Sequence, residues 1–72
     1  MREEDKARVI LDALSDLHKN ETFERALGRM VRNRRGSYED YMDLMADIRE
    51  LATKKKIDLV EAARRIVKAQ GL

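Results

Sequence analysis

The sequence predicts an all-α protein, a small bundle of three to four amphipathic helices. Apolar residues recur at the spacing that places them on one face of a helix. The alternation of apolar and polar residues that indicates strands is absent, and the chain contains no proline. Four segments carry the helical pattern, at approximately residues 3–18, 21–35, 38–55 and 59–70.

The first segment is the most apolar, over more than half of its circumference. Its apolar residues are Ala7, Val9, Ile10, Leu11, Ala13, Leu14 and Leu17. A face this wide suits either the central helix of the bundle or the seam of a dimer. A chain of 72 residues buries a small fraction of its surface, so burial at a subunit interface adds proportionally more stability than in a larger protein. We therefore expect a homodimer.

The second segment carries a narrower apolar stripe. The stripe consists of Phe23, Ala26, Leu27, Met30 and Val31. We expect Asn20 to cap the N-terminus, because its side chain can accept a hydrogen bond from an unpaired backbone N–H. Gly36 is expected to end the helix, because glycine adopts the left-handed conformation at low cost.

The third segment begins with the clearest start signal in the chain. Ser37 is followed three residues later by Asp40, which makes a variant of the capping box. Lys54, Lys55 and Lys56 end the segment and suit the negative end of the helix dipole. Its apolar stripe is Tyr41, Leu44, Met45, Ile48, Leu51 and Ala52, with Tyr38 and Met42 at the edge.

The fourth segment also starts with a capping sequence. Asp58 and Glu61 have the spacing of a capping box, and Ile57 can pack on Ala62 as a hydrophobic staple. Gly71 follows the last apolar residues and is expected to close the helix.

Composition limits the classes of function. The 72 residues make a single helical domain, residues 1–72. The chain has no cysteine and one histidine, so no metal site and no cofactor are expected. Ser15 lies near His18 but lacks the glycine-rich elbow of nucleophilic enzymes, so we predict that the protein is not an enzyme. Signal-peptide and membrane-span patterns are absent, so we expect a cytoplasmic protein with no membrane partner.

Positive charge is concentrated between Glu24 and Gly36, although the net charge of the chain is only +2. Like charges at helical spacing repel, so this arrangement costs stability unless an anion lies nearby. Arginine makes bidentate contacts to phosphate and to guanine, and a run of three lysines offers a second contact. The predicted nucleic-acid contacts are Arg25, Arg29, Arg32, Arg34, Arg35, Lys54, Lys55 and Lys56.

The favoured function is therefore a small non-enzymatic regulator or accessory factor that binds double-stranded nucleic acid. Recognition of single strands is not expected, because Phe23, Tyr38 and Tyr41 lie at or near apolar stripes. Stacking of unpaired bases requires exposed aromatic rings.

The charged segments also fit two further roles. The basic second helix can be neutralised by an acidic third helix, whose carboxylates are Glu39, Asp40, Asp43, Asp47 and Glu50. Alternatively, the protein is an adaptor or inhibitor that binds a protein partner. It would then use the acidic face of the third helix or the apolar face of the first.

Overall fold

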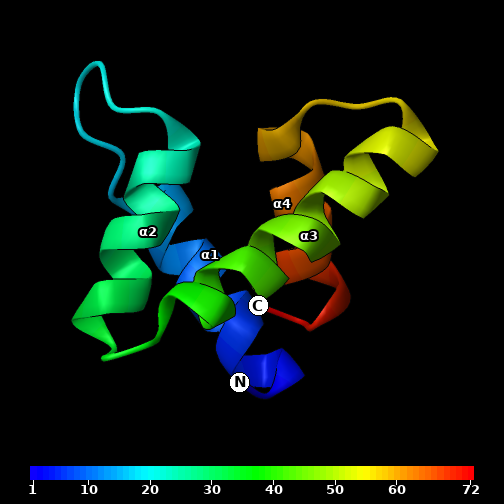
Figure 1. The fold of residues 1–72 in the computed structure, drawn as a ribbon. Coiled ribbons are helices and arrows are strands. Elements are labelled where there is room, and N and C mark those ends of the chain that lie inside the picture. Colours follow the sequence, from blue (N-terminus) through cyan, green and yellow to red (C-terminus); the bar gives the residue numbers. More distant parts are fainter.

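The computed structural model describes residues 1–72, which form four helices and no strands. The helices are α1 (Glu3–Ser15), α2 (Phe23–Asn33), α3 (Tyr38–Lys55) and α4 (Leu59–Ala69). Figure 1 shows them as a compact bundle, which confirms the predicted fold class. None of the four is both long and apolar enough to cross a membrane.

The core forms where the four apolar stripes meet. Helix α1 packs against both α2 and α4, and α3 packs against α4 and, less extensively, against α2. Val9, Ile10 and Ala13 of α1 lie fully inside this core. Helix α1 therefore buries the middle of its apolar face against α2 and α4.

Most of the wide apolar face of α1 is buried against other helices of the same chain. Val9 and Ala13, which favoured a dimer seam, are completely buried, whereas Leu11 remains 37% exposed. Leu17 is exposed as well, because α1 ends at Ser15 rather than at residue 18. The homodimer stays a prediction, and α1 exposes much less apolar surface for a dimer interface than its sequence suggested.

Three of the four helices begin at side-chain caps. The hydroxyl of Ser37 accepts from the N–H of Asp40 at 3.1 Å, and the Asp40 carboxylate accepts from the N–H of Ser37 at 2.9 Å. The carboxylate of Asp58 accepts from the N–H of Glu61 at 2.7 Å. The capping box of the third segment is thus confirmed, whereas the fourth segment forms only the Asp58 half of its predicted box, because the Glu61 side chain does not bond back to the N–H of Asp58.

The predicted cap of α2 is wrong. Thr22, not Asn20, accepts a hydrogen bond, from the N–H of Arg25 at 3.2 Å. Asn20 instead adopts a left-handed conformation, with φ of 66°, in the loop between α1 and α2. Asparagine tolerates that conformation better than most residues, which explains its place in a turn.

Helix α2 ends in a Schellman motif in which the roles of two residues differ from the prediction. The N–H of Gly36 reaches back to the carbonyl of Val31 at 2.8 Å. The left-handed residue is Arg35, with φ of 58°, and not Gly36. A positive charge at a helix C-terminus is favourable, which offsets part of the roughly 1–2 kcal/mol cost of this conformation. Lys56 ends α3 in the same way, with φ of 56°.

Candidate functional site

The five arginines around α2 divide into two groups, and Arg29 belongs to the internally paired group. Its guanidinium donates to both carboxylate oxygens of Glu21, at 2.8 and 3.2 Å. It also donates to the carboxylate of Asp16 at 3.0 Å and to the carbonyl of the same residue at 2.7 Å. Arg29 therefore fastens the loop between α1 and α2 to the side of α2.

This pairing shifts the ionisation of Glu21. Hydrogen bonds from Arg29 and from the backbone N–H of His18 lower the pKa of Glu21 to about 2 from an ordinary value of 4.5. The same contacts, first with Glu21 and then with Asp16, raise the pKa of Arg29. Both members of the ion pair are consequently charged at neutral pH.

A pH dependence of stability follows for Glu21. Its folded pKa lies below its unfolded value, so its contribution is complete above about pH 4.5 and is lost as the pH falls toward 2. Thermal unfolding should therefore show that Glu21→Gln is less stable than wild type at neutral pH and that this gap closes on acidification. The control is Glu39→Gln, which removes an exposed carboxylate without an ion pair. A gap for Glu21→Gln that stays constant to about pH 2 would contradict the assignment.

Arg34 is also paired within the chain. Its guanidinium donates to the carboxylate of Asp12 on α1 at 2.7 Å. Arg29 and Arg34 are therefore neutralised within the chain, but not by the acidic third helix as expected. Their acidic partners lie on α1 and in the loop after it. Asp47 of α3 pairs instead with Lys6 of α1, at 3.2 Å.

The remaining three arginines form the second group. Arg25, Arg32 and Arg35 are exposed and make no ion pair within the chain. Two of them, Arg25 and Arg32, line a groove between α2 and the start of α3. Arg25 and Arg32 thus carry uncompensated positive charge at the groove, whereas Arg29 and Arg34 are neutralised by acids of the same chain.

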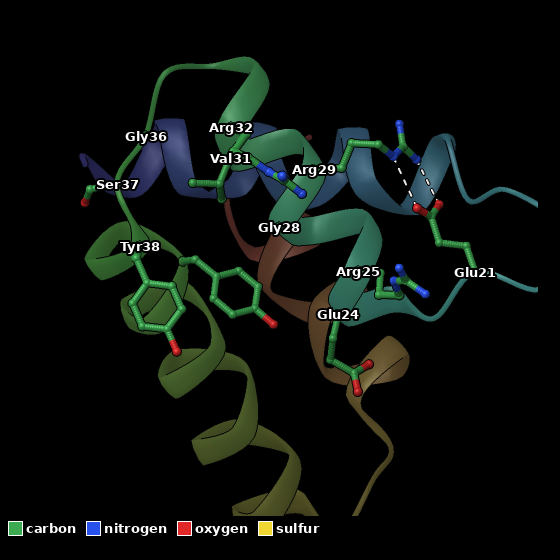
Figure 2. A pocket seen from close by; sticks show the side chains of 11 residues that line it. Glu21, Glu24, Arg25, Gly28, Arg29, Val31, Arg32, Gly36, Ser37 and Tyr38 are labelled. Atoms are coloured by element: carbon green, nitrogen blue, oxygen red, sulfur yellow. Dashed lines mark hydrogen bonds and ion pairs between the residues drawn. The ribbon is translucent and has the colours of Figure 1, made fainter.

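This groove, which we call the arginine groove, has a volume of about 550 Å³. That size lies within the range of small-ligand sites. Figure 2 shows Arg25 and Arg32 extending from α2 while Tyr38 stands on α3 across from them. The lining residues are Glu21, Glu24, Arg25, Gly28, Arg29, Val31, Arg32, Gly36, Ser37, Tyr38 and Tyr41.

Two tyrosines form the α3 wall of the arginine groove. The ring centroids of Tyr38 and Tyr41 lie 6.1 Å apart, with a tilt of 32° between the ring planes. Tyr41 is half-buried against the core, whereas Tyr38 is 75% exposed. The expectation that the tyrosines belong to apolar packing is wrong for Tyr38.

Gly28 lets α2 and the Tyr41 ring approach closely at the groove. A Cβ atom at this position would lie 3.7 Å from the ring of Tyr41. A glycine inside a helix costs roughly 0.5–1 kcal/mol relative to alanine, so its presence here calls for a local reason. Two features of the sequence could have indicated the groove: this mid-helix glycine and the placement of Tyr38 at the edge of a stripe.

The lysines predicted as a second contact lie elsewhere. Lys54, Lys55 and Lys56 are exposed at the C-terminal end of α3, which Figure 1 places on the side of the molecule away from α2. With 18 residues, α3 is about 27 Å long, so the lysines do not line the arginine groove. The neighbouring Arg64 and Arg65 both face Glu61, at 4.0 and 3.6 Å.

Other chemistry has little geometric support in this chain. No three histidine, cysteine, aspartate or glutamate side chains gather closely enough to hold a metal ion. No protein family, curated protein or solved structure matches the sequence. The arginine groove is therefore the feature from which a function can be inferred.

Proposed function

We propose that this protein binds nucleic acid through the arginine groove and acts without catalysing a reaction, as a small regulator or accessory factor. The observation that supports the proposal is the pair Arg25 and Arg32, two exposed guanidiniums without partners at the edges of one concave site. A guanidinium binds a phosphate through two parallel hydrogen bonds, which suits a polyanionic backbone.

The paired arginines strengthen this proposal. Arg29 also lines the groove, but four of its hydrogen bonds go to Glu21 and Asp16, so its charge is already neutralised within the chain. Its role is to hold the start of α2 in place. Arg25 and Arg32 then present their charge from a fixed helix rather than from a mobile segment, which reduces the entropy lost on binding.

Arg35 extends the same positive surface beyond the groove. It lies two residues beyond the end of α2, immediately before Gly36, which lines the groove, and it has no ion pair. Lys54, Lys55 and Lys56 are kept as a second contact, for a nucleic acid long enough to follow α3. Contacts of this kind go to phosphates and carry no sequence information by themselves.

The acidic face of α3 supports a second candidate, a protein adaptor. Glu39, Asp43 and Glu50 lie exposed on that face without a basic partner. Exposed carboxylates on a helix are commonly just hydrated, whereas the arginine groove is concave and combines cations with aromatic rings. We therefore place nucleic-acid binding first.

The proposal is tested by removing the two free charges of the groove. Arg25→Gln/Arg32→Gln should weaken binding to a labelled duplex or single strand on the order of tenfold at low salt. The slope of log affinity against log salt should become shallower by about 0.7–0.9 for each phosphate that the variant no longer neutralises. Fluorescence anisotropy over a salt series measures both quantities.

The matched control is Arg64→Gln/Arg65→Gln, which removes the same charge from α4, where both arginines already face Glu61. It should leave the salt slope nearly unchanged. Glu24→Gln removes the one unpaired acid of the groove and should strengthen binding. If both double variants lose the same amount of binding affinity, nucleic acid is attracted by the net charge alone, and the groove is not the binding site.

A further inference from the structure

The ring of Tyr38, which lines the arginine groove, is largely exposed to solvent. Tyr38 is the most exposed large apolar side chain of the chain, with 75% of its surface accessible. It lies in the first turn of α3, directly after the capping residue Ser37, so the backbone that carries it is fixed by the capping box. Its ring is tilted by 32° from that of Tyr41 at a centroid distance of 6.1 Å, and its high exposure leaves a ring face uncovered.

The free ring and the free charges belong to one site. Tyr38 and Tyr41 line the same groove as Arg25 and Arg32, and Figure 2 shows Tyr38 across the groove from α2. Gly28 lies on the α2 wall, where an added Cβ atom would already be 3.7 Å from the Tyr41 ring, so the exposed face of Tyr38 is the ring surface left for a flat group. The site thus combines an aromatic platform with two phosphate-binding groups.

We propose that the arginine groove binds an unpaired nucleotide of a single-stranded nucleic acid, with its base stacked on Tyr38 and its phosphates held by Arg25 and Arg32. This inference rests on the proposed function and specifies its ligand. It replaces the expectation that single strands are not recognised, which depended on the aromatic residues lying at or near apolar stripes.

The chemistry of the site distinguishes the two kinds of nucleic acid. In a duplex the faces of the bases are stacked on one another, and only phosphates and groove edges are accessible. An exposed ring has nothing to stack on there. In a single strand every base offers a free face, and stacking on aromatic side chains together with cationic backbone contacts is the common mode of binding.

The experiment compares a labelled oligothymidylate of about 12 nucleotides, a duplex of equal length and thymidine monophosphate. The protein contains two tyrosines and no tryptophan, so its intrinsic fluorescence reports directly on the two rings of the groove. We expect the oligothymidylate to bind more tightly than the duplex and to quench the tyrosine fluorescence. The monophosphate should bind far more weakly than the oligonucleotide.

Two substitutions separate stacking from charge. Tyr38→Ala should weaken binding of the oligothymidylate on the order of tenfold and leave duplex binding nearly unchanged. Tyr38→Phe keeps the ring and should bind like wild type. Because Tyr38 is exposed, both variants are expected to stay folded, which circular dichroism verifies.

The outcomes distinguish the two proposals. If the oligothymidylate and the duplex bind with equal affinity, and only Arg25→Gln/Arg32→Gln weakens that binding, the groove binds phosphates alone. In that case the single-strand inference is overturned. The same holds if Tyr38→Ala has no effect on the oligothymidylate, or if the monophosphate binds as tightly as the strand. If neither nucleic acid binds at low salt, both the proposed function and this inference are overturned.

Discussion

Replacing Ile10 by alanine is expected to destabilise the protein by about 2–5 kcal/mol. Ile10 is 1% exposed and lies on α1, the helix that packs against both α2 and α4. Truncation removes apolar atoms from the core and leaves a cavity that neighbouring helices fill only partly. A domain of 72 residues has a total stability of roughly 4–11 kcal/mol, so a large share is lost. Urea unfolding followed by circular dichroism measures the change.

The next residue provides the control. Leu11 is 37% exposed, so Leu11→Ala should cost about 1 kcal/mol or less, because less apolar surface leaves a buried environment. This pair also tests the homodimer that the sequence predicts. If α1 forms a dimer seam, Leu11 is covered in solution, its replacement becomes as costly as that of Ile10, and the unfolding midpoint rises with protein concentration. Equal costs with no concentration dependence would contradict the difference in burial between Ile10 and Leu11.

Local signals in the sequence were sufficient to predict the four helices and the starts of α3 and α4. The positions of Ser37 and Asp58 determine where α3 and α4 begin, because a cap acts on backbone groups two or three residues away. The stop of α2 was harder to assign. Arg35 takes the left-handed conformation and Gly36 packs against Val31, so the glycine follows the left-handed residue instead of occupying it, an assignment that the presence of glycine alone did not reveal.

The ion pairs could not be predicted from local patterns. Arg29 reaches Asp16 and Glu21 because the loop between α1 and α2 folds back beside α2. A helical wheel shows only that the arginines share a face, and it gives no information on which acids lie opposite. The sequence therefore indicated a basic segment, whereas the selection of Arg25 and Arg32 as free groups required the three-dimensional structure.

Tyr38 illustrates the limit of periodicity for a functional site. Its position at the edge of the α3 stripe is compatible with either packing or exposure. The outcome is decided by the sparse contact between α2 and α3, which leaves a groove instead of a closed interface. The separation of two helices is a property of the whole bundle, and the apolar periodicity of neither segment encodes it.

Gly36→Ala is expected to destabilise the protein by about 1–3 kcal/mol, the usual cost of overpacking. An added Cβ would lie 2.7 Å from Cγ1 of Val31 and 3.1 Å from the carbonyl oxygen of the same residue. Val31 is buried and β-branched, so its methyl groups cannot rotate away within a helix without strain. The backbone turn between α2 and α3 must therefore move.

The same substitution at Gly28 is expected to have the opposite sign, with a gain of about 0.5–1 kcal/mol. Here the new methyl group meets only the Tyr41 ring, at an ordinary contact distance of 3.7 Å, and the helix gains a better helix former. Chemical denaturation of the two variants beside wild type measures both changes. Destabilisation by Gly28→Ala would show that α2 and Tyr41 approach more closely than in this structure. A neutral Gly36→Ala would show that the α2–α3 turn yields easily, and a groove with a yielding wall could not hold Tyr38 and Arg32 at a fixed separation.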